Sequence, residues 1–195
     1  DTNKIVDAAH NAIDPIPTKE IYDELPEELQ PYINKNLFIY HAPKRGVRHY
    51  AGVDVASGTG GNNDNSTMTV FDSDGRQVAS FYANDVPVYQ FASIVNAIGR
   101  YFNYAYVCAE RNSFGLPLLE RLDIHYRYEN LYKQRVFDQK GKKRKQLGYI
   151  TSAVTKPIII NDLKEQFELL LIQINCRETL EEMKIYQDTG GKLGN

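Results

Sequence analysis

The segment Tyr50-Ala-Gly-Val-Asp-Val-Ala-Ser-Gly58 decides the fold, because it places the charged residue Asp54 inside a stretch that otherwise looks like a strand. We predict a strand over residues 50–56 and two further strands over residues 67–72 and 77–82. The Asp-Gly signal of a tight hairpin lies between the second and third strands, at residues 72–75. Three strands with short connections predict an antiparallel meander.

A helix and a fourth strand follow the meander. Asp85 has the character of an N-cap and Pro87 suits a first turn. Helical spacing then relates the apolar residues Val88, Phe91, Ala92, Val95 and Ile98. Residues 104–109 form an apolar run that predicts a buried strand, followed by a short helix over residues 116–122. This order predicts an α/β fold of the RNase H-like (RuvC and integrase) type. Its mixed sheet would combine the meander with a parallel fourth strand and flanking helices.

The remaining segments predict an N-terminal arm, a hairpin and a late helix. Residues 1–36 contain four prolines and one candidate helix over residues 26–33, so we interpret them as an arm or linker from a preceding domain, before the main domain at 37–195. An extension that packs onto the core is the alternative. A hairpin is expected with its tip at residues 139–145. The late helix, at residues 157–172, would present an apolar face to the core. The residues of that face are Ile159, Leu163, Phe167 and Leu170.

Two carboxylates stand at the ends of strands that we expect to be neighbours. Asp54 lies in the first strand and Glu110 ends the fourth, so both side chains should converge on one point. A charged residue in a buried strand is costly unless it is paired or binds a metal ion, and carboxylate oxygens are the ligands that hard divalent cations prefer. Asp64, in the glycine- and asparagine-rich loop between the first two strands, could reach the same site. The alternatives are a satisfied turn residue for Asp54, a helix cap for Glu110 and a solvated loop residue for Asp64.

A second feature is the strongly basic stretch from Lys133 to Lys145, which holds seven cations and one anion in a chain whose net charge is −2. Such a run cannot enter a core, and it predicts contacts with DNA phosphates that carry no sequence preference. A solvated hairpin tip is the alternative. The residues expected to contact DNA are Lys140, Lys142, Lys143, Arg144 and Lys145.

Other classes of function are disfavoured. No apolar run approaches the length of a transmembrane helix, and the N-terminus has no apolar signal region, so we expect neither membrane insertion nor secretion. Cys108 and Cys176 fit a reducing compartment. The loop Gly58-Thr-Gly-Gly61 lacks the Gly-Lys-Ser/Thr ending of a P-loop, so this chain does not encode ATP hydrolysis of that type.

Several segments of the chain resemble those of a known family, the nuclease domains of phage-type terminase large subunits. The resemblance covers about residues 38–195 and depends on the order of several motifs. The matching segments are Tyr50–Gly58, Asp64-Asn-Ser66, Val70-Phe-Asp72, Val86-Pro-Val-Tyr-Gln-Phe-Ala92, Ala109-Glu-Arg-Asn-Ser-Phe-Gly115, Leu147-Gly-Tyr-Ile-Thr-Ser152, Thr155-Lys-Pro157 and Leu180–Gly194.

The resemblance implies a Mg²⁺- or Mn²⁺-dependent endonuclease that cuts concatemeric double-stranded viral DNA with two metal ions. Asp54 and Glu110 would be metal ligands, Asp64 a supporting acid, and Asn112 and Gly115 residues that shape the adjoining loop. It further implies a preceding ATPase domain, a portal protein, a small terminase subunit and the host cell cytoplasm. We expect this chain to be a monomeric fragment.

One departure from the family concerns the third acidic motif. The family usually has an acidic pair and a final helix shortly after a glycine-rich turn such as residues 190–194, and this chain ends at Asn195. Asp188 precedes that turn and is a poor substitute. The metal site is therefore expected to lack one ligand here.

Three other functions stay open on the sequence. A Holliday-junction resolvase would use the same acids. An actin- or sugar-kinase-type ATPase also has an aspartate before a glycine- and threonine-containing loop, although that fold needs a duplicated second half. A non-catalytic module that docks within the packaging motor or binds DNA is the third alternative.

Overall fold

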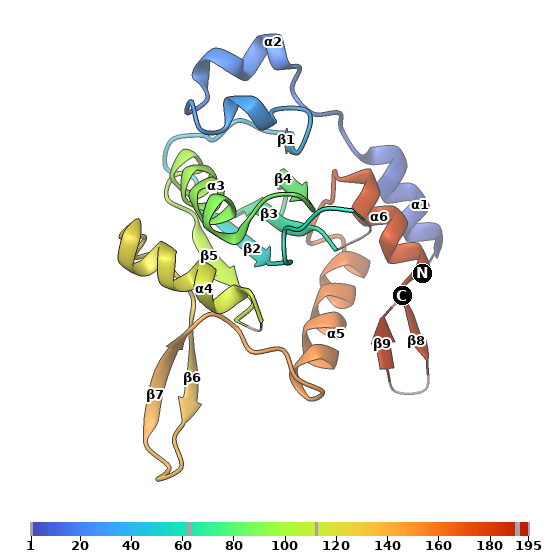
Figure 1. Ribbon diagram of the computed structural model, residues 1–195. Helices are drawn as coiled ribbons and strands as arrows, with labels where there is room; N and C mark the ends of the chain where they lie inside the picture. Colours follow the sequence, from blue (N-terminus) through green and yellow to red (C-terminus); the bar gives the residue numbers. More distant parts are fainter. Residues whose placement is uncertain (1, 62–63, 112, 190–191, 195) are drawn as a thin grey trace.

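A computed structural model describes residues 2–61, 64–111, 113–189 and 192–194, and its centre is a mixed five-stranded sheet (Figure 1). The spatial order of the strands is β1-β4-β3-β2-β5. Their bounds are β1 (Leu37–Ile39), β2 (His49–Asp54), β3 (Ser66–Asp72), β4 (Gln77–Ala83) and β5 (Tyr106–Ala109).

The predicted topology is confirmed. Strands β2, β3 and β4 form an antiparallel meander, and β5 pairs parallel to β2 with Val53 opposite Ala109. The predicted tight turn joins β3 and β4, where Asp72 Oδ1 accepts hydrogen bonds from the backbone of Asp74 and Arg76. Strand β1 adds an antiparallel edge beside β4 that we did not predict, because three residues are too few to show a periodic pattern.

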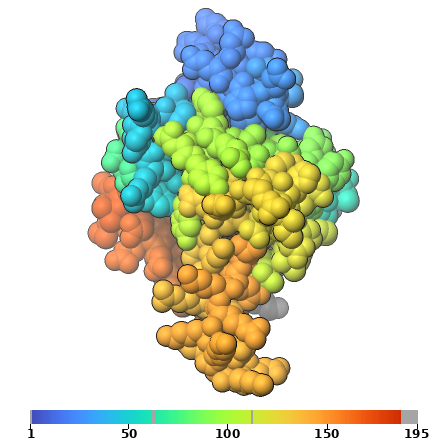
Figure 2. Space-filling view, turned by 90° about the vertical axis from the view of Figure 1, so that its left-hand side faces the viewer, coloured from blue at the N-terminus to red at the C-terminus, as the bar shows by residue number. Residues whose placement is uncertain are grey.

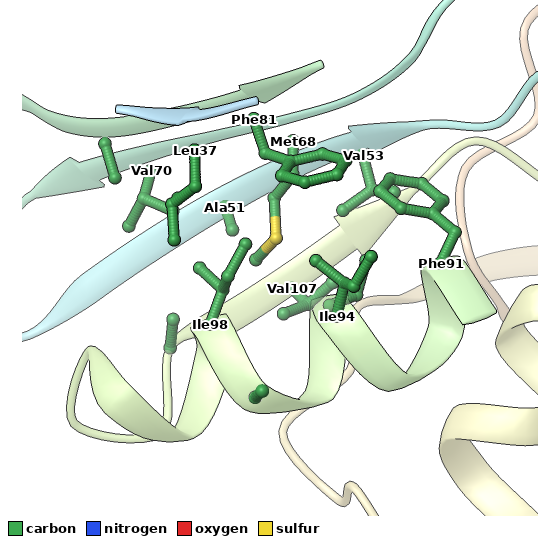
Figure 3. Close-up of a cluster of buried hydrophobic side chains, with 14 of the residues drawn as sticks. Leu37, Ala51, Val53, Met68, Val70, Phe81, Phe91, Ile94, Ile98 and Val107 are labelled. Atoms are coloured by element: carbon green, nitrogen blue, oxygen red, sulfur yellow. The ribbon is translucent and has the colours of Figure 1, made fainter. Parts of the chain in front are cut away.

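Helix α3 (Val88–Tyr101) covers one face of this sheet. The helical apolar spacing seen in the sequence places Phe91, Ile94 and Ile98 against the inward-facing side chains of the strands (Figure 3). These three side chains are at most 1% exposed. The strand residues labelled opposite them are Leu37, Ala51, Val53, Met68, Val70, Phe81 and Val107. The main core therefore lies between α3 and the sheet.

The helix between β4 and β5 begins two residues later than predicted. Pro87 is its N-cap residue, with φ −60° and ψ 152°, so Asp85 does not cap it. After β5 the predicted short helix is present as α4 (Gly115–Glu120), which continues into a π-helical turn, η3 (Arg121–His125). The hairpin β6 (Lys133–Phe137) and β7 (Lys143–Leu147) follows.

The N-terminal arm is packed onto the domain. It holds α1 (Thr2–Asn11), α2 (Thr18–Ile21) and two 3-10 turns, η1 (Tyr22–Glu24) and η2 (Gln30–Tyr32). The helix predicted over residues 26–33 is therefore wrong and is replaced by turns. Its apolar residues are nevertheless buried in the main core, with Leu29 0% exposed. That the arm connects to an ATPase domain stays a prediction.

The C-terminal part forms a second, smaller cluster. Helix α5 (Thr155–Glu168) is followed by α6 (Arg177–Ile185) and the short strands β8 (Gln187–Thr189) and β9 (Lys192–Gly194). Phe167 and Leu180 pack with residues of α1 in this cluster. The apolar face predicted for the late helix is wrong in its other positions, because Ile159 and Leu163 are 42% and 43% exposed. Leu170 lies after the helix and is 81% exposed.

Candidate active site

Two carboxylates meet where the parallel strands β2 and β5 end. Along β2 the residues alternate between buried and exposed, so Val53 points into the core and Asp54 to the open face. The amide of Glu110 donates to the carbonyl oxygen of Val53 at 2.9 Å, which continues the parallel ladder by one residue beyond β5. Asp54 and Glu110 are thus neighbours at the same edge of the sheet, as the sequence predicted.

The side chains of the two acids interact directly. Burial is the largest cause that raises the pKa of Asp54, and a side-chain hydrogen bond with Glu110 and the negative charge of Glu110 raise it further. The charge of Asp64 acts in the same direction, while the backbone of Val55 lowers the pKa through a hydrogen bond. A hydrogen bond between two carboxyl groups requires a shared proton, so the pair has a strong electrostatic reason to accept a cation in its place.

The loop that carries Asp64 is fastened at several points. Ser66 Oγ accepts from the amide of Ala56 at 3.0 Å. The carbonyl oxygen of Asn84 accepts from the amide of Gly60 at 2.8 Å, and the Asn84 side-chain amide donates to the carbonyl oxygen of Gly61 at 2.9 Å. At Gly58, whose φ is +69°, a Cβ atom would lie 2.1 Å from the carbonyl oxygen of Val86. These contacts hold an exposed Asp64 close enough to influence Asp54.

The turn after Glu110 is equally close-packed. A Cβ atom at Gly115 would lie 1.7 Å from the carbonyl oxygen of Glu110, so the start of α4 can approach the acid only with glycine there. This agrees with a supporting place for Gly115 beside the site. Asn112, to which the sequence analysis gave a similar place, lies outside the described residues.

Two acids form the centre of the site. Within the described parts of the chain, no group of three or more His, Cys, Asp or Glu side chains is arranged to hold a metal ion. Asp188 lies in β8, in the C-terminal segment. That the third acidic motif of the family supplies a further ligand stays a prediction.

The predicted basic hairpin projects from the body of the domain. Strands β6 and β7 pair from Lys133–Leu147 to Phe137–Lys143 and extend well beyond the sheet (Figures 1 and 2). Asp138 organises the tip, since its Oδ1 accepts from the amides of Lys140 and Lys142 at 2.9 Å and its Oδ2 lies 3.2 Å from Arg144 Nε. All five cations expected to contact DNA are exposed.

Sequence reasoning missed the residue that fixes the base of this hairpin. Arg111 follows Glu110 directly, and its Nη1 donates to the carbonyl oxygen of Leu147 at 3.1 Å. The available signal was an arginine placed immediately after a strand-terminal acid, which we read only as part of a family motif.

Comparison with known proteins supports the fold independently. Neither a protein-family model nor a curated protein sequence matches this chain. Among solved structures, the large terminase nuclease from thermophilic phage G20c with bound magnesium is 18% identical, with a TM-score of 0.61; the match covers 81% of this chain and 75% of that one.

Two further solved structures give the same result. The G20c nuclease with bound cobalt is 20% identical, with a TM-score of 0.60 over 84% of this chain and 77% of that one. The Thermus phage P74-26 large terminase nuclease domain is 20% identical, with a TM-score of 0.57 over 88% and 77%. At these identities the likeness establishes the fold, which is the RNase H-like fold of terminase nuclease domains.

Proposed function

We propose that this chain is the metal-dependent DNA endonuclease domain of a phage packaging terminase. The observation that carries the proposal is the meeting of Asp54 and Glu110 on the open face of a sheet whose fold is that of terminase nucleases. The G20c nuclease, which is similar in fold, has been solved with bound magnesium and with bound cobalt. This supports a divalent metal as the cofactor.

The residues present fit a divalent cation. Asp54 and Glu110 share a hydrogen bond that raises the pKa of Asp54, and a doubly charged ion would relieve the same repulsion more strongly than one proton does. Both ligand atoms would be carboxylate oxygens, which suits Mg²⁺ or Mn²⁺. Asp54 and Glu110 would hold such ions, which would supply Lewis-acid polarisation of the phosphate and an activated water.

Each residue then has a defined task. The backbone ladder between Val53 and Glu110 fixes the spacing of the two acids, and Asp64 orients a ligand or water molecule beside them. Gly115 lets α4 approach without displacing Glu110. The exposed lysines and Arg144 of the hairpin hold the duplex through its phosphates, so binding carries no sequence preference.

In the infected cell the substrate would be concatemeric double-stranded DNA in the host cytoplasm. An ATPase domain, a portal protein and a small terminase subunit would be the partners of the complete motor. Among the described residues, none of the helices combines the length and apolar character that crossing a bilayer requires.

The test is cleavage of supercoiled plasmid by the full-length protein in Mg²⁺ or Mn²⁺, with a chelator as the blank. We expect cleavage by the wild-type protein and by Asp162→Ala, which removes an exposed aspartate from α5, and none by Asp54→Ala. Cleavage by Asp54→Ala at the wild-type rate would overturn the proposal. A wild-type chain that binds duplex DNA without cutting it in either metal would favour the docking-module alternative.

A structure-selective substrate separates the resolvase alternative. A terminase nuclease should cut linear duplex and four-way junctions at similar rates, because phosphate contacts position the duplex without reading its shape. A strong preference for the junction would favour a resolvase.

A further inference from the structure

We propose that Arg111 is a positioning residue, which fixes the direction of the basic hairpin relative to Glu110 so that hairpin-bound DNA is held at the two acids. The proposal rests on the proposed function for its DNA substrate. The contacts that support it join the base of the hairpin to β5.

The base of the hairpin is bonded to β5 on both of its strands. On the β6 side, the amide of Tyr132 donates to the carbonyl oxygen of Val107 at 2.8 Å. On the β7 side, the amide of Tyr149 donates to the carbonyl oxygen of Ala109 at 2.9 Å, and its carbonyl oxygen accepts from the amide of Arg111 at 2.8 Å. Tyr149 thus bonds to the residue before Glu110 and the residue after it.

Glu110 is therefore held between two partners. Its own amide donates to Val53, next to Asp54, and its two neighbours bond to Tyr149, at the exit of the hairpin. A change in the position of the hairpin base must act on the backbone of Glu110. The hairpin and the pair of acids are connected through one short segment of chain.

The Arg111 side chain adds a second connection, outside the backbone ladder. Its Nη1 donates to the carbonyl oxygen of Leu147. With the Gln146 amide oriented so that its oxygen faces the guanidinium group, that oxygen accepts from Arg111 Nε at 2.7 Å and Nη2 at 2.9 Å. One guanidinium group thereby holds the last two residues of β7 with charge-assisted hydrogen bonds.

The packing at Gly148 keeps this contact close. Its φ is +78°, and a Cβ atom there would lie 2.8 Å from the carbonyl oxygen of Ala109 and 3.3 Å from Arg111 Cβ. The base of the hairpin at Gly148 is therefore closely packed against Ala109 and Arg111. Beyond this base, β6 and β7 extend away from the body of the domain (Figure 2), so small rotations at the base become large displacements of the cations at the tip.

Hydrogen exchange tests the connection without requiring activity. In the full chain, Arg111→Met should raise the exchange rates of the Gly148 and Tyr149 amides at least about tenfold, since hydrogen bonds to charged groups contribute more than neutral ones. Amides of β3 and β4 should be unchanged, and Arg111→Lys should fall between. Arg100→Met is the matched control, because Arg100 likewise donates to a side-chain amide oxygen, of Asn96, and to a backbone carbonyl, of Tyr126.

Cleavage kinetics test the positioning role itself. We expect Arg111→Met to lower the single-turnover rate about tenfold while the Kd for duplex DNA stays within about twofold, because the phosphate-binding cations are intact. When residues 135–145 are replaced by an Asn-Gly turn, the same substitution should have no further effect on the rate.

Two results would overturn the proposal. One is unchanged exchange at Gly148 and Tyr149 in Arg111→Met. The other is an equal loss of rate from Arg111→Met with and without the hairpin, which would mean that Arg111 supports Glu110 directly. Failure of the proposed function is distinguishable, because it would appear as equal cleavage by wild type and Asp54→Ala and would leave the exchange result standing.

Discussion

Where β2 and β5 form the main sheet, its two faces have opposite properties. On the face covered by α3, Val53 and Val107 are 5% and 0% exposed and belong to one apolar core. On the open face, Tyr50 and Tyr106 are 44% and 38% exposed, and the two acids stand at the strand ends. Alternation along β2 and β5 thus assigns stability to one face and chemistry to the other.

This difference means that alternate residues along β2 and β5 should contribute either to stability or to function. The covered face contributes the free energy that holds β2 and β5 in register. The open face depends on that register, because Asp54 and Glu110 meet only while the strands stay aligned. At the open face, burial and then the interaction with the Glu110 carboxyl group raise the pKa of Asp54. The following experiments test the separation, from the largest expected effect to the smallest.

Substitutions on the two faces at β5 should have opposite effects on activity and on stability. Glu110→Gln keeps the shape of the side chain and removes its charge, so we expect a loss of about a thousandfold in kcat, corresponding to several kcal/mol of lost metal-assisted catalysis. Its free energy of unfolding should stay within about 1 kcal/mol of wild type.

The matched variant for that experiment is Val107→Ala, on the covered face of β5. It should lose about 2 kcal/mol of unfolding free energy and keep a kcat within about twofold of wild type below its unfolding midpoint. Plasmid cleavage and urea unfolding measure the two quantities. A Glu110→Gln protein that unfolds readily, or a Val107→Ala protein that is stable but inactive, would break the separation of the faces.

The alternation of faces along these strands was predictable from sequence, and it explains why the two acids could be picked out as candidates. Asp54 disturbs an otherwise strand-like segment, and Glu110 ends an apolar run, so each acid stands out locally. Their meeting followed from one further step, the parallel pairing of the two strands through a helical crossover. The contribution of the hairpin base was not predictable, because the hydrogen bonds of Arg111 and Tyr149 join residues 36 to 40 positions apart without a local pattern.

Aromatic residues on the two faces should differ in their contribution to stability. Phe91→Ala empties a site that is 0% exposed, so we expect a loss of about 3–5 kcal/mol in the free energy of unfolding. Tyr106→Ala removes an open-face ring that contacts Tyr50 and Tyr132 edge-on, and about 1 kcal/mol should be lost. Urea unfolding of both variants measures the difference, and equal losses would show that the open face is also part of the core.

Errors in the sequence analysis have the same physical origin in each case: local pattern does not reveal what a segment packs against. Ile159 and Leu163 have helical spacing, yet α5 buries its later residue Phe167 and leaves these two partly exposed. In the arm, apolar residues at near-helical spacing are buried by turns instead, because Pro31 has no amide hydrogen to donate within a helix over residues 26–33.

The hairpin sharpens the comparison, since the DNA affinity proposed for it involves neither face. Replacing Lys142, Lys143 and Lys145 by alanine should weaken duplex binding roughly tenfold to a hundredfold at low salt. The slope of log Kd against log salt concentration should fall by about 0.9 for each lost phosphate contact. Fluorescence anisotropy over a salt series gives both values.

The control for that triple variant removes exposed lysines elsewhere, at Lys19, Lys35 and Lys164. It carries the same change in net charge, so it separates local contacts from the overall charge of the chain. Equal loss of affinity in the two triple variants would indicate that general charge, and not the hairpin, attracts DNA.

The smallest effect concerns the stability cost of the open face. Because the pKa of Asp54 is raised in the folded chain by burial and by Glu110, the folded state binds this proton more tightly than the unfolded state does. Its contribution to stability is therefore complete below the pKa of the unfolded chain and is lost as the pH rises through the folded pKa. Asp54→Asn, which cannot ionise, should unfold at a higher urea concentration than wild type at about pH 7 in the presence of a chelator, and the difference should vanish near pH 3.

Added Mg²⁺ should stabilise the wild-type protein and leave the variant less affected, since binding to the folded state alone raises its stability. A variant less stable than wild type at neutral pH would mean that the Asp54 carboxylate contributes to the fold as the covered face does, and the division between the two faces would then end one residue short of the active site.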